Sequence, residues 1–403
     1  MERKKEKLNK ILKNLFIAIF LITFLVAVYE AGVLVGRREI SFNGLKPQII
    51  KNQENGDLDF SLFWQILRIV EEEFPGQIDY QKIIYGAING ALKSLDDPYS
   101  YFMTEEEGKM LLEDAEGKFG GIGAEIGAKD NKIQIMSVLE GTPAQRAGLL
   151  AGDVILKIND NDVVDMSLYE AVKQIRGEPK TEVKLTIQRE GLKEPKDFVI
   201  VRDIINITTV KYELKENDIA YIKILQFTEN TEENLKQAVE FFKDKKIKGI
   251  VLDLRDNPGG ELGVTVDIAS YFLNKKPVLI EKFKDGKLKR DYCKDNPVFK
   301  DEPLVVLING GTASAAEILA AAIQDNKRGI LIGEKTFGKG SVQRIERIKN
   351  GYLRLTIAYW LTPSGKSINK EGLSPDIEIK MVDQNLQDKR DLQLQKAIDY
   401  LKK

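Results

Sequence analysis

The residues best placed to do chemistry in this sequence are Ser314 and Lys339. The chain contains no histidine. A serine–histidine–aspartate triad, a cysteine–histidine pair and an HExxH zinc site are therefore all excluded. A serine nucleophile would need another base. A lysine amine can act as that base when burial lowers its pKa enough for the neutral form to be present.

Ser314 follows an apolar segment, 304–308, that is predicted to be a buried strand, and it precedes a segment, 315–323, that favours helix. A hydroxyl at such a junction is held rigidly, and the free amides at the start of a helix can stabilise an oxyanion. The four residues from Ser314 to Glu317 also fit a capping box, so Ser314 alone could be only a helix cap.

Lys339 lies in a glycine-flanked loop that follows a predicted strand at 329–333. Glycine neighbours allow other backbone to approach closely, and exclusion of water would lower the pKa of the amine. Gln343 lies four positions further on, on the same side of either a helix or a strand, and could hold the amine by a hydrogen bond. On its own, a lysine in such a turn is usually a solvated surface residue.

A third loop follows another buried strand and contains two glycines, Gly259 and Gly260, whose backbone amides could face a developing negative charge. The charged residues just before them, Asp253, Arg255 and Asp256, are predicted to fix the turn through an ion pair or a cap rather than to react.

A glycine-rich segment, 119–123, opens a module of short alternating strands with a helix at 168–175. Its glycines could leave amides free for the terminal carboxylate of a peptide, which would pair with residues 124–126 as an added strand. The apolar side of the helix that begins at Leu168 would receive the last side chain. The glycines alone would fit a tight structural turn equally well.

The remaining segments supply the framework. Helical periodicity is present from 59 to about 112, and the aromatic turn at 99–102 is predicted to serve packing. From Ile204 onward strands and helices alternate, which predicts an α/β domain with a largely buried sheet and functional residues at strand ends.

The N-terminus predicts a membrane anchor. Basic residues at positions 3 to 13 precede an uncharged run, 15–29, which reaches spanning length at Val35 if Glu30 lies near the interface. The positive-inside rule then predicts a single-pass protein of the cell membrane, with everything after Arg38 outside the cytoplasm. A cleaved signal peptide, with a site near Ala31, stays open.

Charge and cysteine content exclude other classes of partner. The chain has 61 basic and 62 acidic residues, which gives no electrostatic reason to expect nucleic acid. Its single cysteine, Cys293, excludes an intramolecular disulfide and a zinc site built on several cysteines. No metal or organic cofactor is expected.

The three loops and the inserted module together resemble the carboxy-terminal processing, or tail-specific, proteases of the serine/lysine type, over nearly all of 79–379. Ala316 stands where many relatives carry a small polar residue. The resemblance implies a nucleophile, a general base and its positioning partner, an oxyanion hole, and a peptide-binding PDZ groove. By this resemblance Ser314 is the nucleophile, Lys339 the general base and Gln343 its positioning partner. The oxyanion hole is formed by Gly259 or Gly260 together with Ala315. The peptide-binding groove is formed by Gly120, Gly121, Ile122, Gly123, Ala124 and Leu168.

The resemblance also implies the fold class, an α/β protease core related to the crotonase and Clp-type peptidases with an inserted, mainly-β PDZ domain. The predicted domains are a basic tip and transmembrane helix at 1–38, a helical region at 39–116, the PDZ domain at 117–192, the peptidase core at 193–382 and a C-terminal helix at 383–403.

The expected function is a serine endopeptidase whose protein substrates are recognised near their C-termini. A catalytically silent membrane-anchored PDZ scaffold is the main alternative, and the intact set of Ser314, Lys339 and Gln343 argues against it. An amidase or esterase that uses the same dyad is a second alternative. The terminal helices could mediate a homodimer, although 383–403 is charged and could equally be a solvated helix.

Overall fold

The computed structural model describes residues 59–129, 132–164, 166–295, 297–381 and 391–402. The chain divides into two compact units, 1–80 and 81–403. In the described part of the first unit there is one helix, α2 (Ser61–Glu73). The predicted membrane segment, 15–35, lies outside the described residues. None of the helices within the described ranges is both long and apolar enough to cross a bilayer.

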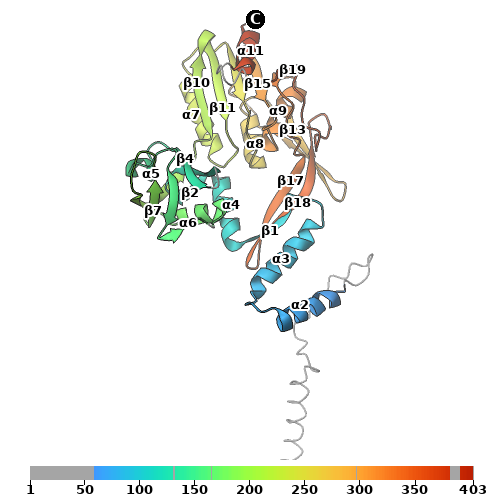
Figure 1. Cartoon of the computed structure of the whole chain (residues 1–403). Coiled ribbons are helices and arrows are strands. Elements are labelled where there is room, and N and C mark those ends of the chain that lie inside the picture. The colour runs from blue at the N-terminus through green and yellow to red at the C-terminus, as the bar shows by residue number, and fades with distance from the viewer. Residues whose placement is uncertain (1–58, 130–131, 165, 296, 382–390, 403) are drawn as a thin grey trace, which may run out of the picture. The chain divides into compact units, whose positions relative to one another are not determined.

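The second unit is built around a central sheet (Figure 1). Its described strands run in the order β10-β11-β12-β15-β16-β19, and all neighbours are parallel except β10 and β11. Strands β12 and β15 are buried along their whole length, which explains why their residues are apolar apart from Asp253 at the end of β12. The strand bounds are β10 Val210–Lys215, β11 Ile219–Ile224, β12 Gly249–Asp253, β15 Leu304–Ile308, β16 Ile330–Gly333 and β19 Ile377–Glu378.

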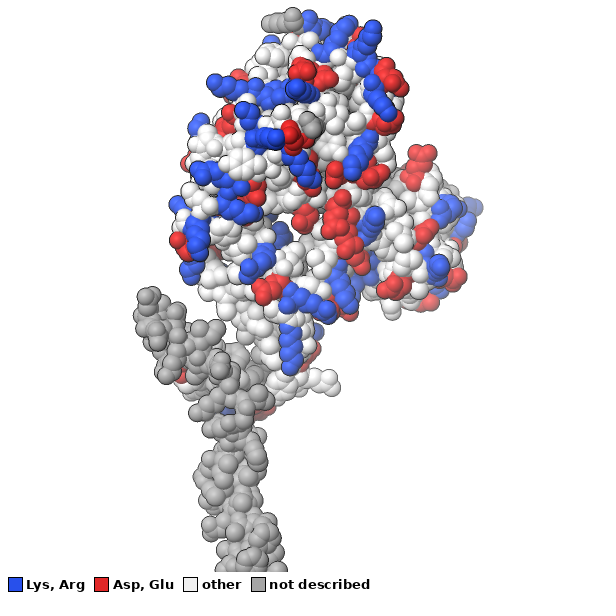
Figure 2. All heavy atoms as spheres, turned by 180° about the vertical axis from the view of Figure 1, so that it is seen from behind, with Lys and Arg blue, Asp and Glu red and all other residues white. Residues whose placement is uncertain are grey.

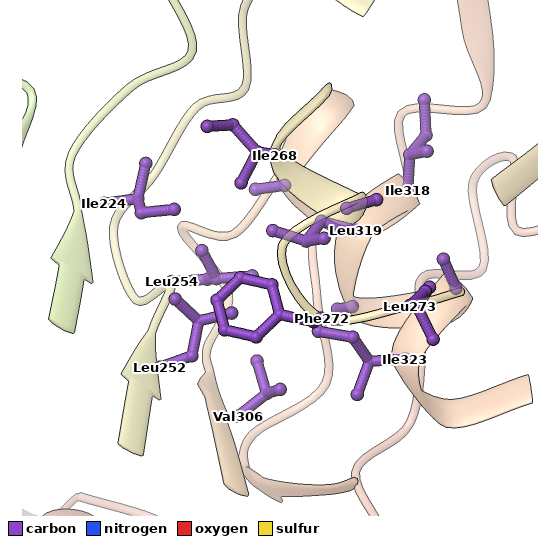
Figure 3. Close-up of a cluster of buried hydrophobic side chains, with 14 of the residues drawn as sticks. Ile224, Leu252, Leu254, Ile268, Phe272, Leu273, Val306, Ile318, Leu319 and Ile323 are labelled. Carbon is purple, nitrogen blue, oxygen red and sulfur yellow. The ribbon is translucent and has the colours of Figure 1, made fainter. Parts of the chain in front are cut away.

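Helices cover both faces of this sheet. On one face the Phe272 ring packs among Leu252, Leu254 and Val306 of the sheet region and Ile323 of the helix α9, as Figure 3 shows. The helices of this face are α7 (Thr231–Phe242), α8 (Leu262–Ala269) and α9 (Ala315–Asp325). On the other face the helix α11 (Leu392–Leu401) buries Ala397 and Leu401 in a second cluster with Val251, Val305 and Leu307. The described part of the C-terminal helix is thus packed on the sheet rather than fully solvated.

An ion-pair network joins α11 to the loop after β12. Arg255 contacts the buried carboxylate of Asp253 at 2.6 Å and Asp391 at 2.8 Å. Tyr221 also donates to Asp253, at 2.7 Å, and Asp391 caps α11 by accepting from the Leu394 amide. Because the buried carboxylate is fully paired, the network fixes the turn, which confirms the structural role predicted for Asp253 and Arg255.

A second sheet carries residues from both ends of the unit. Strand β18 (Gly351–Leu361) pairs with β1, β13 and β17, so a strand near residue 100 lies beside one near residue 355. The helix α3 (Tyr80–Lys93) precedes β1, and α4 (Glu105–Glu116) follows it. The other strand bounds are β1 Tyr101–Thr104, β13 Pro277–Phe283, β14 Leu288–Tyr292 and β17 Ser341–Ile348.

The inserted module has its own sheet and its own core. Its strands run in the order β3-β4-β5-β7-β8, and β6 pairs with β5. The chain enters along β2 (Lys118–Gly121) and leaves along β9 (Asp203–Asn206), which pair antiparallel, as expected for an insertion. The remaining elements are β3 Ala124–Lys129, β4 Lys132–Val138, α5 Pro143–Ala147, β5 Val154–Ile158, β6 Asn161–Asp162, α6 Leu168–Ile175, β7 Glu182–Gln188 and β8 Lys196–Val201.

The surface carries both signs of charge. On the face shown in Figure 2, basic and acidic side chains are interspersed. That face therefore offers no extended field of one sign to a polyanion such as nucleic acid.

Candidate active site

The loops after four neighbouring strands, β11, β12, β15 and β16, converge beside a cavity of about 280 Å³. The carboxyl ends of parallel strands are where ligands bind in open α/β sheets. All six residues predicted for catalysis line this cavity: Ser314, Lys339, Gln343, Gly259, Gly260 and Ala315. Among the described residues, no group of acidic or cysteine side chains is arranged to hold a metal ion.

Ser314 occupies a strained turn between β15 and α9. Its φ of 52° and ψ of −118° place a non-glycine residue in a sparsely populated region, at a cost of roughly 1–3 kcal/mol. A sharp turn of this kind between strand and helix exposes a nucleophile above a sheet. Thr312 links this turn to the loop after β12, because its hydroxyl donates to the Leu254 carbonyl at 2.8 Å.

Glu317 joins this turn to the Lys339 loop. Its side chain is fully buried, and its carboxylate accepts from the Ser314 amide at 2.8 Å and the Lys339 amide at 2.9 Å. It also accepts from the Gly338 amide at 2.8 Å and the Thr336 hydroxyl at 2.5 Å. The sequence pattern indicates Glu317 only as part of a helix cap. The glutamate three residues after a strand-end serine was the available signal, but nothing local indicated its contacts with the second loop.

The Lys339 backbone is held from both sides. Besides the bond from its amide to Glu317, its carbonyl accepts from the indole of the buried Trp360 at 3.0 Å. The side chain lies over the Tyr99 ring, with Nζ 4.6 Å from the ring centre. A cation at this distance from an aromatic face is attracted to it. The aromatic turn that was predicted to serve packing thus contacts this lysine.

The pKa of the Lys339 amine is lowered to about 8, from an ordinary 10.5, chiefly by burial and in the same direction by the charge of Arg354. Asp97 and Glu317 oppose this shift because negative charge favours the ammonium form. A substantial fraction of the amine is therefore neutral near pH 8. Lys339 is not the solvated surface lysine that its loop alone would suggest.

Gln343 lines the cavity but bonds to other groups than the lysine amine. Its side-chain nitrogen donates to Ser341 Oγ at 2.8 Å and to Thr356 Oγ1 at 3.2 Å. The Thr356 amide donates to Ser100 Oγ, which in turn donates to the Asp97 carboxylate. These bonds connect Gln343 on β17, through Thr356 on β18, to the turn that contains Asp97. The Asp97 carboxylate interacts electrostatically with the Lys339 amine.

The predicted oxyanion donors differ in their availability. The Gly259 amide already donates to Asn257 Oδ1 at 2.9 Å. The bridge between Phe227 and Gly260 uses the Gly259 carbonyl and the Glu261 amide, so the Gly260 amide takes no part in it. Ala315, as the first residue of α9, has an amide without a partner inside the helix. This geometry favours Gly260 over Gly259 as the partner of Ala315.

Gly259 has a different role, which is close approach. A Cβ at this position would lie 2.8 Å from the Ser314 Cβ and 2.9 Å from the Ala315 nitrogen. Its φ of 99° is also one that other residues rarely adopt. Only glycine allows the loop after β12 to pack this closely against the serine turn.

In the inserted module, a second cavity of about 370 Å³ lies between β3 and α6. Its lining includes 121–124, as predicted, with Val172 and Ile175 from the helix. The other predicted residues lie elsewhere: the Gly120 carbonyl accepts from Gly177, and Leu168 lines a separate cavity. Ile122 is only 2% exposed, its side chain belongs to the module core, and its carbonyl accepts from the Ala144 amide at 2.7 Å.

Glu317→Gln is expected to loosen the link between the two loops. An amide replaces one accepting oxygen by an NH2 group, which faces backbone N–H donors and leaves at least one of them buried without an acceptor. The expected loss is roughly 1–3 kcal/mol in the free energy of unfolding, measured by urea denaturation. The Gly338 and Lys339 amides should also exchange with deuterium faster in the variant.

Glu346→Gln on β17 is the matched control, because this glutamate is exposed and pairs only with Arg344 at 3.2 Å among the described contacts. Its expected effect is below about 0.5 kcal/mol. Equal stability losses in the two variants would contradict the role given to Glu317.

Comparison with known proteins supports this architecture. The chain is 41% identical to the carboxy-terminal-processing protease of Bartonella bacilliformis over 366 residues, which cover 89% of this chain and 82% of that protein. It is 39% identical to the carboxy-terminal processing protease CtpA of Bacillus subtilis, over 83% of this chain and 72% of that protein. A solved structure named as an S41 protease from Bacteroides fragilis shares the fold, with a TM-score of 0.50 at 18% identity, over 78% of this chain and 87% of that one.

Family models match three consecutive parts of the chain. They are the N-terminal domain of the activating protease CtpB at 30–107, the PDZ domain at 110–188 and peptidase family S41 at 218–379. The predicted protease core with an inserted PDZ domain is thereby confirmed. The chain belongs to peptidase family S41, the carboxy-terminal processing proteases, and is a serine peptidase.

Proposed function

We propose that the chain is an endopeptidase in which Ser314 attacks the peptide carbonyl and Lys339 is the general base. The observation that carries this proposal is the shared cavity, in which a strained serine meets a lysine whose pKa is lowered to about 8, chiefly by burial. The amides of Gly260 and Ala315 stabilise the oxyanion. Gln343 acts as a positioning residue through Ser341 and Thr356 rather than through a direct bond to the amine.

In the proposed reaction the neutral Lys339 amine accepts the Ser314 hydroxyl proton while the oxygen bonds to the carbonyl carbon. The resulting ammonium gives its proton to the leaving amine as the peptide bond breaks and an acyl-serine forms. Water then repeats the sequence, with Lys339 again accepting a proton, and releases the acid and the free serine. Preorganised amides that face the developing oxyanion contribute about 3–4 kcal/mol each in comparable enzymes.

Cleavage of an unstructured protein should depend on the neutral amine. Below pH 8 the amine is mostly protonated, so kcat/KM should rise about tenfold per pH unit and level off above about pH 8. Ser314→Ala and Lys339→Arg should each reduce the rate by at least about a thousandfold, because a guanidinium keeps its proton. The measurement is the initial rate of purified variants between pH 5 and pH 10.

Lys335→Arg is the control, since this lysine is exposed in the same loop and should keep the wild-type rate. A near wild-type rate for Lys339→Arg would show that the lysine is not the base. It would return the silent scaffold, or another nucleophile–base pair, to consideration.

The groove between β3 and α6 is proposed to bind the C-terminus of a protein substrate. The backbone of 121–124 would receive the terminal carboxylate, and Val172 and Ile175 would contact the last, apolar side chain. Binding measured on Ser314→Ala should be at least about tenfold weaker for a C-terminally amidated peptide than for the free acid. Equal affinities would mean that the groove does not read a terminus.

The apolar segment at 15–35 is proposed to anchor the chain in the cell membrane with the peptidase outside the cytoplasm. Its support is the basic cluster that precedes it. The full-length protein should stay in the membrane fraction after a high-pH carbonate wash. Release into the supernatant, or a mature N-terminus just after Ala31, would contradict the anchor.

A further inference from the structure

Arg354 is a charged residue of the cavity that the proposed reaction does not use. It lies on β18 opposite Tyr101 of β1 and lines the same cavity as Ser314 and Lys339. Its Nη1 donates to the Tyr101 hydroxyl at 2.9 Å, and its guanidinium also lies 5.7 Å from the Tyr101 ring centre. Its Nε is buried and has no hydrogen-bond acceptor in the part of the chain that the structure describes.

No carboxylate among the described residues lies within ion-pair distance of Arg354, although two line the same cavity. Asp114 of α4 is engaged with Arg176 at 2.7 Å. Glu261, which follows β12, has a pKa raised by burial and by Glu229, and Arg354 only partly offsets that shift. Removing a cation from water is unfavourable unless it is paired, so the cavity holds an arginine that lacks a counter-ion.

Arg354 also carries the same charge as the Lys339 ammonium and disfavours that form. This effect alone could explain a cation at this position. It does not explain the choice of a residue with several directed N–H donors, of which Nε is left without an acceptor. A guanidinium matches a carboxylate in charge and in geometry, and can bind it through two hydrogen bonds.

We propose that Arg354 is a carboxylate-binding subsite, which binds a substrate carboxylate close to the scissile bond. The proposal rests on the proposed peptidase function and adds a preference to it. The carboxylate has two possible sources. It can be the side chain of Asp or Glu beside the scissile bond, or the terminal carboxylate of a substrate that is cut within about two residues of its end.

Matched peptides separate these sources. One series carries Glu or Gln on either side of the cleaved bond in an otherwise constant peptide with an amidated C-terminus, so that the PDZ groove contributes equally throughout. The second series places the bond two residues from a C-terminus that is either free or amidated. Wild type, Arg354→Gln and Arg354→Lys are compared by kcat/KM for each peptide, with Arg347→Gln as the control.

Wild type should cleave the carboxylate member of one series about tenfold faster than its neutral partner, because a charged hydrogen bond is lost with the neutral one. Arg354→Gln should abolish this ratio, and Arg354→Lys should retain part of it. Arg347 is an exposed residue of β17 that pairs with Glu105, so its variant should keep the ratio. The series that responds identifies the source of the carboxylate.

A ratio near one in wild type, or an unchanged ratio in Arg354→Gln, would overturn the subsite. If Arg354→Gln slows all peptides equally and moves the pH profile upward, Arg354 acts only through Lys339. If wild type cleaves none of the peptides, the proposed function fails separately. Binding of the same peptides to Ser314→Ala, with and without Arg354→Gln, then decides the subsite by the same ratio.

Discussion

The geometry of the cavity depends on the hydrogen bonds that the Glu317 carboxylate accepts. A buried anion is tolerated only when hydrogen bonds replace its hydration, and here four donors from two loops do so. The serine turn is strained and the lysine loop lacks regular structure, so neither would hold its position alone. The carboxylate fixes both backbones to one point, while the buried Trp360 holds the Lys339 carbonyl from the opposite side.

The pKa of the Lys339 amine results from opposing electrostatic contributions. Burial and the like charge of Arg354 favour the neutral amine, whereas Asp97 and Glu317 favour the ammonium form. The Tyr99 ring, whose centre lies 4.6 Å from Nζ, also attracts the ammonium form. A base that alternates between the two forms benefits from this balance, because proton transfer is most effective when the pKa of the base is near the working pH.

Much of the site could be predicted from the sequence because its parts follow buried strands. Apolar runs and the loops after them located Ser314, Lys339 and the pair Gly259 and Gly260, and the absence of histidine left lysine as a base. The partners of Lys339 could not be found this way, because Asp97 comes beside it only through the pairing of β1 with β18. The prediction that Gln343 lies on the same side of the chain as Lys339 assumes a regular segment. A register shift between Val342 and Gln343 interrupts β17 instead.

The capping-box pattern at Ser314 fits both a helix cap and a nucleophile, so this local pattern alone could not separate the two functions. The Ser314 amide does bond to Glu317, as a cap requires, and the same carboxylate extends to the second loop. The buried Asp253 carboxylate follows the ordinary rule for a buried charge, because it is fully paired with Arg255 and Tyr221. Three exceptions to these rules meet in one cavity: a strained serine, a half-buried lysine and an arginine that has no counter-ion among the described residues. Because each exception costs stability, their concentration there is best explained by the chemistry of that cavity.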